Sequence, residues 1–144
     1  MKKTFLLTVM AGCILFGGAT LAQKVKSSQV PAAANSALLK KYPTATKVTW
    51  EKEKGNFEAN WGGKSGEDMS VIFSPNGAFI EQVEAIPVGA LPSSVTKYVA
   101  ANYKGAKIAE AGRVTDGAGK TMYEAEVKGK DLVFDNQGAF IKID

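Results

Sequence analysis

Acidic residues at alternating positions are the first candidates for chemistry in this sequence. Glu58 lies between two apolar residues, and Glu124 and Glu126 lie on either side of Ala125. Two carboxylates held on one face can act as a general acid and base or bind a cation. The same alternation is typical of half-buried strands whose outer side chains face solvent and pair with lysines on neighbouring strands. We favour the structural interpretation and keep the three glutamates as candidates for a binding face.

Other residue types that support catalysis are scarce. The 144 residues include no His and one Cys, which excludes Ser-His-Asp and Cys-His catalysis and the common zinc sites. The glycine-rich stretches at residues 62–66 and 117–121 superficially resemble phosphate-binding loops, but neither has the G-x-x-x-x-G-K-[ST] spacing. The sequence therefore predicts no catalytic residue, no metal site and no cofactor.

Residues 1–22 have the organisation of a secretory signal peptide. Two lysines precede an apolar run over residues 5–16, and small residues occupy the −3 and −1 positions of a cleavage site between Ala22 and Gln23. A lipoprotein motif ending in Cys13 is the less favoured alternative, because the apolar run continues beyond that residue. No later segment approaches the roughly 18 apolar residues of a membrane span. We expect a soluble protein in the periplasm or outside the cell.

The charge of the remaining chain gives little reason to expect a nucleic-acid partner. After residue 22, 16 Lys and Arg residues are nearly balanced by 14 Asp and Glu residues, and Arg113 is the one arginine. Binding to the phosphate backbone normally requires clustered basic side chains, rich in arginine. With its only Cys in the leader, the mature chain also forms no disulfide.

The chain after the leader contains the same unit twice. An offset of 61 residues places Pro31 on Pro92, and five of the ten residues in 71–80 are identical in 132–141. Between these anchors the offset drifts to 66, because a longer loop in one copy is compensated by a longer loop in the other. Matching ends with compensating loops indicate a duplication, with repeat 1 over residues 23–84 and repeat 2 over residues 85–144.

Each repeat is predicted to be one helix followed by four strands. Apolar residues recur at four-residue spacing over residues 34–42 and 95–103, each time after a proline suited to the first helical position. Beyond each helix the apolar period becomes two, with turn sequences between the short runs. The fold class is α+β, with each helix packed on an antiparallel four-stranded meander. Because each copy alone has a marginal core, we expect the repeats to pack together, with residues 23–29 disordered or loosely attached.

The two tryptophans could serve as core residues or as binding anchors. Trp61 shares strand parity with Phe57 and Ala59, which favours the core. Trp50 has a non-aromatic counterpart in repeat 2, which points to surface use, whereas its size makes partial burial equally compatible. Trp50 therefore joins the candidates for a binding face.

The order of motifs in both repeats resembles a known family. Tyr-x-x-Ala follows each predicted helix, at Tyr42 and Tyr103, and Gly-x-Phe-Glu-Ala begins at Gly55. Over residues 28–144 the chain is similar to the PepSY-like, β-lactamase-inhibitor-like family of exported bacterial proteins. The resemblance implies a tandem helix-plus-sheet fold and a location in the periplasm or outside the cell. Related PepSY domains occur in propeptides of secreted metallopeptidases, and the namesake inhibitors grip an enzyme across a sheet face. Their inhibitory loops and disulfides have no match here, so no inhibitory site is transferred.

These observations predict a non-catalytic exported module that recognises a protein or peptide of the cell envelope through a sheet face, in the manner of a peptidase or enzyme inhibitor. The candidate residues of the binding face are Trp50, Glu58, Glu124 and Glu126. The alternative is a periplasmic carrier of a small ligand or cation, which would use the strand carboxylates and the cleft between the repeats. An enzyme would have to rely on carboxylate, lysine and tyrosine side chains alone. The oligomeric state stays open.

Overall fold

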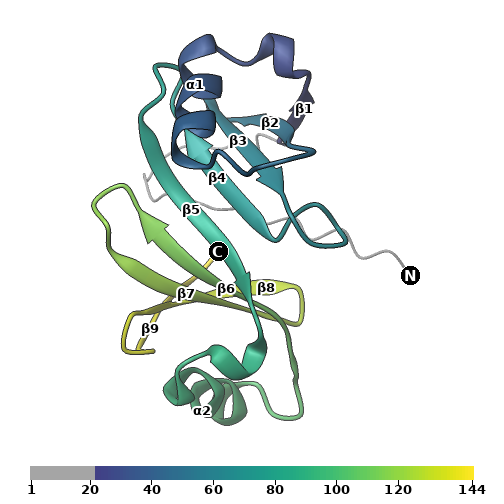
Figure 1. Ribbon diagram of the computed structural model, residues 1–144. Helices are drawn as coiled ribbons and strands as arrows, with labels where there is room; N and C mark the ends of the chain where they lie inside the picture. The colour runs from purple at the N-terminus through teal and green to yellow at the C-terminus, as the bar shows by residue number, and fades with distance from the viewer. Residues whose placement is uncertain (1–21) are drawn as a thin grey trace.

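Nine strands form one sheet in chain order, with every neighbouring pair antiparallel, and two α-helices pack against it (Figure 1). The computed structural model describes residues 22–144, so the predicted leader and Cys13 lie outside the described residues. The strands are β1 (Gln23–Val25), β2 (Thr49–Glu53), β3 (Asn56–Trp61), β4 (Met69–Phe73), β5 (Phe79–Ile86), β6 (Ile108–Asp116), β7 (Thr121–Val127), β8 (Lys130–Asp135) and β9 (Phe140–Ile143). The helices are α1 (Ala32–Lys41) and α2 (Ser93–Asn102), with short 3-10 helices η1 (Ser27–Gln29) and η2 (Val88–Ala90). Within residues 22–144, neither α-helix has the length and hydropathy needed to cross a membrane.

The strands of the two repeats belong to a single sheet, not to two separate meanders. Strands β2–β5 follow α1 and β6–β9 follow α2 in the chain. Strand β5 joins the repeats because it pairs with β4 along one edge and with β6 along the other. Its eight residues allow the two pairings to overlap along its length.

The segment before α1 is ordered, which corrects the expectation for residues 23–29. Strand β1 pairs with β2, with Val25 opposite Trp50, and η1 follows directly. Such a short, mainly polar strand has no alternation that could reveal it in the sequence. At the offset of 61, β1 corresponds to Glu84–Ile86, the end of β5, and Ile86 lies opposite Ala111 as Val25 lies opposite Trp50. The end of β5 thus pairs with the first strand after α2, as β1 pairs with the first strand after α1.

The duplication extends to the ends of the helices. Pro31 and Pro92 both have φ −53° and immediately precede the first helical residue, one position earlier than expected. Tyr42 and Tyr103 follow the last helical residue, both with φ −130°, and each donates its backbone N–H to the carbonyl four residues earlier.

A glycine in each repeat contacts the first turn of its helix. Gly77 and Gly138, 61 residues apart, have φ of 83° and 80°, the left-handed region that favours glycine. A Cβ added at Gly77 would lie 2.6 Å from the carbonyl oxygen of Ala33, and one added at Gly138 would lie 2.0 Å from Oγ of Ser94. Ser94 in turn donates a hydrogen bond to the carbonyl of Gln137. The same turn therefore holds the same helix position in both repeats.

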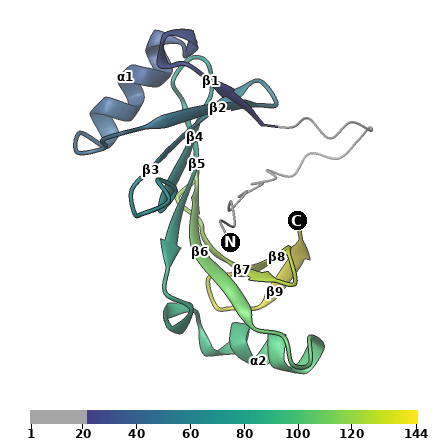
Figure 2. The same ribbon diagram turned by 90° about the vertical axis from the view of Figure 1, so that its right-hand side faces the viewer.

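Each helix covers its own half of one sheet face. Ala34 and Leu38 of α1 are buried against β2–β4, and Val95 and Val99 of α2 are buried against β6–β8. Figure 2 shows both helices on the outer side of the curved sheet. The opposite face of the sheet is covered by neither helix.

Candidate functional site

Strand register assigns alternate side chains to the face that neither helix covers, which we call the helix-free face. A row of residues crosses it from β2 to β6: Glu51 lies opposite Glu58, which lies opposite Ile72, then Glu81 and Asp116. Each residue in the row is paired with the next across neighbouring strands. The row therefore spans both repeats without interruption.

Acidic residues are concentrated on the helix-free face. Strand register places ten of the fourteen acidic residues of the sequence there, against three basic residues of the described chain. The acidic residues are Glu51, Glu53, Glu58, Glu81, Asp116, Glu124, Glu126, Asp131, Asp135 and Asp144, and the basic residues are Lys24, Lys120 and Lys142. Residues 23–144 as a whole have 16 basic and 14 acidic residues, so this face has the opposite sign to the chain that carries it.

An apolar strip runs through the acidic residues. Val83 lies opposite Val114, and Val114 lies opposite Met122, one row along the strands from Glu81. Val83 and Val114 are buried although no helix covers them. The helix-free face thus combines an apolar strip with carboxylates on both sides.

Glu58 is the carboxylate of the helix-free face on β3. It is buried and accepts a hydrogen bond from the hydroxyl of Ser70 on β4. Burial raises the pKa of Glu58 to about 7, and the negative charges of Glu51 and Glu53 add to the increase, whereas the Ser70 hydrogen bond opposes it. A large share of Glu58 is therefore protonated near neutral pH.

Glu81 is the corresponding buried carboxylate on β5, the strand that joins the repeats. Its side chain is 7% exposed, and its Oε1 has no hydrogen-bond partner. Burial and the charge of Asp116 raise its pKa to about 7. Because an unpaired buried polar atom costs free energy, Glu81 has an unused capacity to accept a hydrogen bond.

Glu124 occupies the helix-free face of repeat 2. It lies opposite Gly112 on β6 and Val133 on β8, and it is buried. Burial, followed by the charge of Asp131, raises its pKa to about 8. Glu126 lies two residues further along β7, half-buried and opposite Asp131.

The structure places three of the four sequence-derived candidates on the same face of the sheet, with Glu58 four strands away from the other two. Glu58, Glu124 and Glu126 share the helix-free face, whereas Trp50 is 4% exposed and belongs to the core under α1. Its counterpart Ala111 is also a core residue, so the position kept its apolar character and changed only its size. The interpretation of Trp50 as a surface anchor is therefore corrected.

Two further expectations about these residues have clear outcomes. Trp61 is partly buried and packs against Tyr42 in the core cluster, with ring centroids 5.1 Å apart. The cross-strand lysines expected beside the glutamates are not their partners, because Glu58 lies opposite Glu51 and Ile72. Glu81 was not among the candidates, because it follows two consecutive apolar residues, Phe79 and Ile80, and lacks the alternation that marked the other glutamates.

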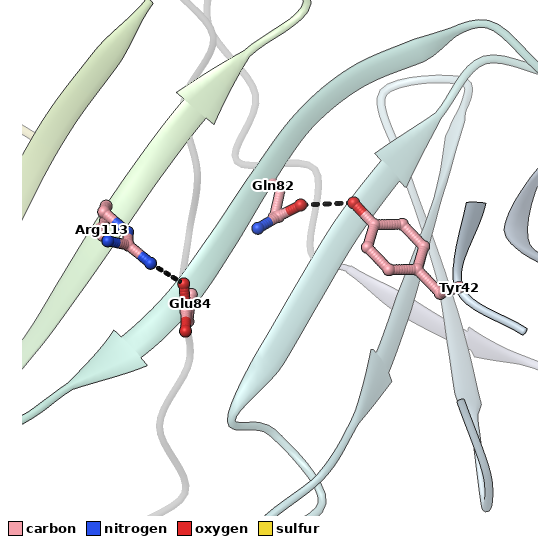
Figure 3. Close-up of polar contacts among 4 residues, drawn as sticks. All are labelled: Tyr42, Gln82, Glu84 and Arg113. Carbon is pink, nitrogen blue, oxygen red and sulfur yellow. Dashed lines mark hydrogen bonds and ion pairs between the residues drawn. The ribbon is translucent and has the colours of Figure 1, made fainter. Parts of the chain in front are cut away.

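Two polar contacts lie on the helix side, one within repeat 1 and one between the repeats (Figure 3). The hydroxyl of Tyr42, at the end of α1, donates a hydrogen bond to Oε1 of Gln82 on β5. Arg113 on β6 forms an ion pair with Glu84 on β5, with 2.5 Å between Nη2 and Oε2. Burial raises the pKa of Tyr42 to about 12, so the hydroxyl keeps the proton that it donates. These contacts are structural and lie away from the helix-free face.

A separate concavity lies near η2, between the loop before β4 and the start of β6. Its lining includes Asp68, Ile86, Pro87 and Ala111. None of the buried glutamates of the helix-free face contributes to it. No group of three or more acidic side chains within residues 22–144 is arranged to hold a metal ion.

Comparisons with known proteins show which family has this architecture. The family model described as “Putative beta-lactamase-inhibitor-like, PepSY-like” matches residues 20–81 and, again, residues 66–142. No protein among the curated sequences matches the chain.

Several solved structures share the fold. A structure described as “putative periplasmic proteins” from Bacteroides eggerthii has 20% sequence identity and a TM-score of 0.70, covering 80% of this chain and 88% of that one. A DUF2874 family protein from Bacteroides uniformis has 24% identity and a TM-score of 0.69, covering 79% and 88%. A BLIP-like protein from Bacteroides fragilis has 24% identity and a TM-score of 0.62, covering 79% and 85%. Because the two family matches together span nearly all of residues 20–142, the protein belongs to the PepSY-like, β-lactamase-inhibitor-like family and contains its unit twice.

Proposed function

We propose that this protein is a non-catalytic exported module that binds a protein or peptide through the helix-free face of its sheet. The observation that carries the proposal is one continuous face, spanning both repeats, that combines an apolar strip with ten acidic residues. Apolar contacts supply affinity and the surrounding charges supply specificity in protein interfaces.

The dimensions of the face suit a macromolecular partner. Neighbouring strands lie about 4.8 Å apart, so nine strands offer a width of roughly 38 Å. A stable interface takes about 800 Å² from each partner. A face of this width is larger than a small ligand requires.

The family and its structural relatives support the location and the mode of binding in the proposal. Relatives described as periplasmic and as BLIP-like share the fold. Together with the leader predicted over residues 1–22, they support export to the periplasm, with binding across the sheet as an inhibitor binds its enzyme. Identity of fold alone does not fix a function, so the argument depends on the chemistry of the face.

A cation carrier is the second candidate from the sequence, and the structure gives it less support. Carboxylates crowd the helix-free face, but within residues 22–144 no three of them are grouped as metal ligands. Lys142 also forms an ion pair with Asp144 on this face.

Site-specific photocrosslinking in intact cells would test the proposal. A photoreactive amino acid replaces Glu126 on the helix-free face in one variant and Leu39, 62% exposed on α1, in the other. We expect a discrete crosslinked species from the Glu126 position and none from the Leu39 position. Equal crosslinking from the two positions, or crosslinking from Leu39 alone, would contradict the proposal.

A further inference from the structure

We infer that the segment bound by the helix-free face is a basic peptide, rich in lysine or arginine, with apolar side chains interspersed. The inference rests on the proposed function and specifies the chemistry of its partner. Three independent features of the helix-free face carry it: its charge, an unsatisfied carboxylate and the apolar strip.

The first feature is the separation of charge between the two sides of the sheet. Ten acidic residues and three basic residues share the helix-free face, while residues 23–144 as a whole have 16 basic and 14 acidic residues. Burial raises the pKa of Glu58 and Glu81 to about 7 and that of Glu124 to about 8, so the other seven acidic residues carry most of the negative charge near neutral pH. A basic segment is attracted to this face and repelled by the rest of the molecule, which fixes the side on which it docks. An acidic protein, a nucleic acid or an anionic membrane surface would be repelled by the same face.

The second feature is the carboxyl group of Glu81. Among the described residues, its Oε1 is the one buried side-chain oxygen or nitrogen atom without a hydrogen-bond partner. The side chain is 7% exposed, and strand register directs it to the helix-free face beside Ile72 and Asp116. An ammonium or guanidinium group donates the missing hydrogen bond and balances the charge of the carboxylate at the same time.

The third feature is the apolar strip beside Glu81. Val83 and Val114 lie two residues along their strands from Glu81 and Asp116, respectively. Rows separated by two strand residues are about 7 Å apart. Val83 and Val114 are themselves buried, so the apolar surface that a partner can still cover beside Glu81 belongs to the partly buried Ile72 and Met122.

Three synthetic peptides of 14 residues provide the probe. Each has leucines at amphipathic helical spacing, with lysine, glutamine or glutamate at all other positions. Fluorescence anisotropy of labelled peptides gives Kd at 50 mM and 300 mM salt, and amide chemical-shift changes in the full chain identify the face that is contacted.

Two variants connect the binding to the carboxylates. At pH 9, above the pKa values of about 7 for Glu81 and about 8 for Glu124, the double variant E81Q/E124Q removes two negative charges from the helix-free face with almost no change of shape. The control E84Q removes a charge from the same strand as Glu81 but from the helix side, where Glu84 pairs with Arg113. Circular dichroism of all variants verifies that each is folded.

We expect the lysine peptide to bind at least ten-fold more tightly than the glutamine peptide and to perturb amides of β3–β8. Its Kd rises at least five-fold in E81Q/E124Q and falls back toward the glutamine value at high salt, while E84Q leaves it unchanged. If the glutamine peptide binds the helix-free face as tightly as the lysine peptide, the basic partner is wrong while binding at this face stands. If no peptide perturbs the face, or E84Q weakens binding as much as E81Q/E124Q, the inference is overturned. The crosslinking test then decides the proposed function separately.

Discussion

Glu124 shows how a single buried carboxyl group couples stability to pH. Burial raises its pKa from 4.5 to about 8, so the folded chain holds the proton more tightly than the unfolded chain does. The stabilisation is complete below about pH 4.5, where both states are protonated, and it is lost as the pH rises toward 8. Glu58 and Glu81, each with a pKa raised to about 7, act in the same direction. The free energy of unfolding should therefore fall between about pH 5 and pH 8.

Replacing Glu124 by glutamine tests this directly, because the amide imitates the protonated carboxyl group. At pH 8.5 we expect E124Q to be more stable than the wild type by about 2–4 kcal/mol, and at pH 5 nearly as stable. Urea unfolding at both pH values measures the difference, and E84Q, on the other face, should leave the pH dependence unchanged. A loss of stability in E124Q of equal size at both pH values would contradict the expected protonation.

For single residues, the sequence predicted which face of a strand each glutamate occupies but not how deeply it is buried. Alternation around Glu58 and Glu124 correctly placed them on one face. It could not reveal that both are buried, since burial depends on the packing of the whole chain. Trp50 was misjudged because a change from tryptophan to alanine between repeats indicates a change of volume as readily as a change of exposure.

The turn that follows β4, and its counterpart after β8, are the elements that fix each helix on the sheet. Gly77 and Gly138 lie in these turns and touch residues 33 and 94 of the helices. The duplication and the turn sequences predicted the turns. The close contact with the helix could not be predicted, because it depends on where the helix docks.

Alanine substitutions at Gly55 and Gly77 should separate the free-energy cost of the backbone conformation from the cost of the contact with the helix. At Gly55, where φ is 81° and the space is open, alanine costs about 1 kcal/mol for the backbone conformation alone. At Gly77, the contact with the backbone of Ala33 adds to that cost, and we expect a total of about 2–4 kcal/mol. Urea unfolding of G55A and G77A measures both values. Equal losses in the two variants would show that the helix moves away freely.

At the scale of the whole molecule, strand β5 joins the strands of both repeats into one sheet. Its pairing with both β4 and β6 makes the edge strand of one repeat an interior strand of the sheet. The fold class and the two repeats were predictable from periodicity and self-similarity. The fusion into one sheet was not, because no local pattern in residues 79–86 distinguishes an edge strand from a shared one.

A core substitution in repeat 2 should therefore also lower the unfolding midpoint of repeat 1. Both tryptophans lie in repeat 1, at Trp50 and Trp61, so tryptophan fluorescence reports on that repeat alone. V99A removes buried volume from α2 and should cost about 2 kcal/mol. We expect its unfolding midpoint to shift equally by fluorescence and by far-ultraviolet circular dichroism. An unshifted fluorescence midpoint would show that the repeats unfold independently.

The correspondence between β1 and the end of β5 has an architectural consequence. The end of β5, the last strand of repeat 1, fills the position in repeat 2 that β1 fills in repeat 1. One repeat can therefore be followed directly by another in the same sheet. This pairing does not limit the number of repeats to two. A chain lengthened by residues 26–86, inserted after Ile86, could extend the same sheet in register. Each added copy would bring another Glu58 and Glu81, so a ribbon of any length would carry its carboxylates along one continuous side.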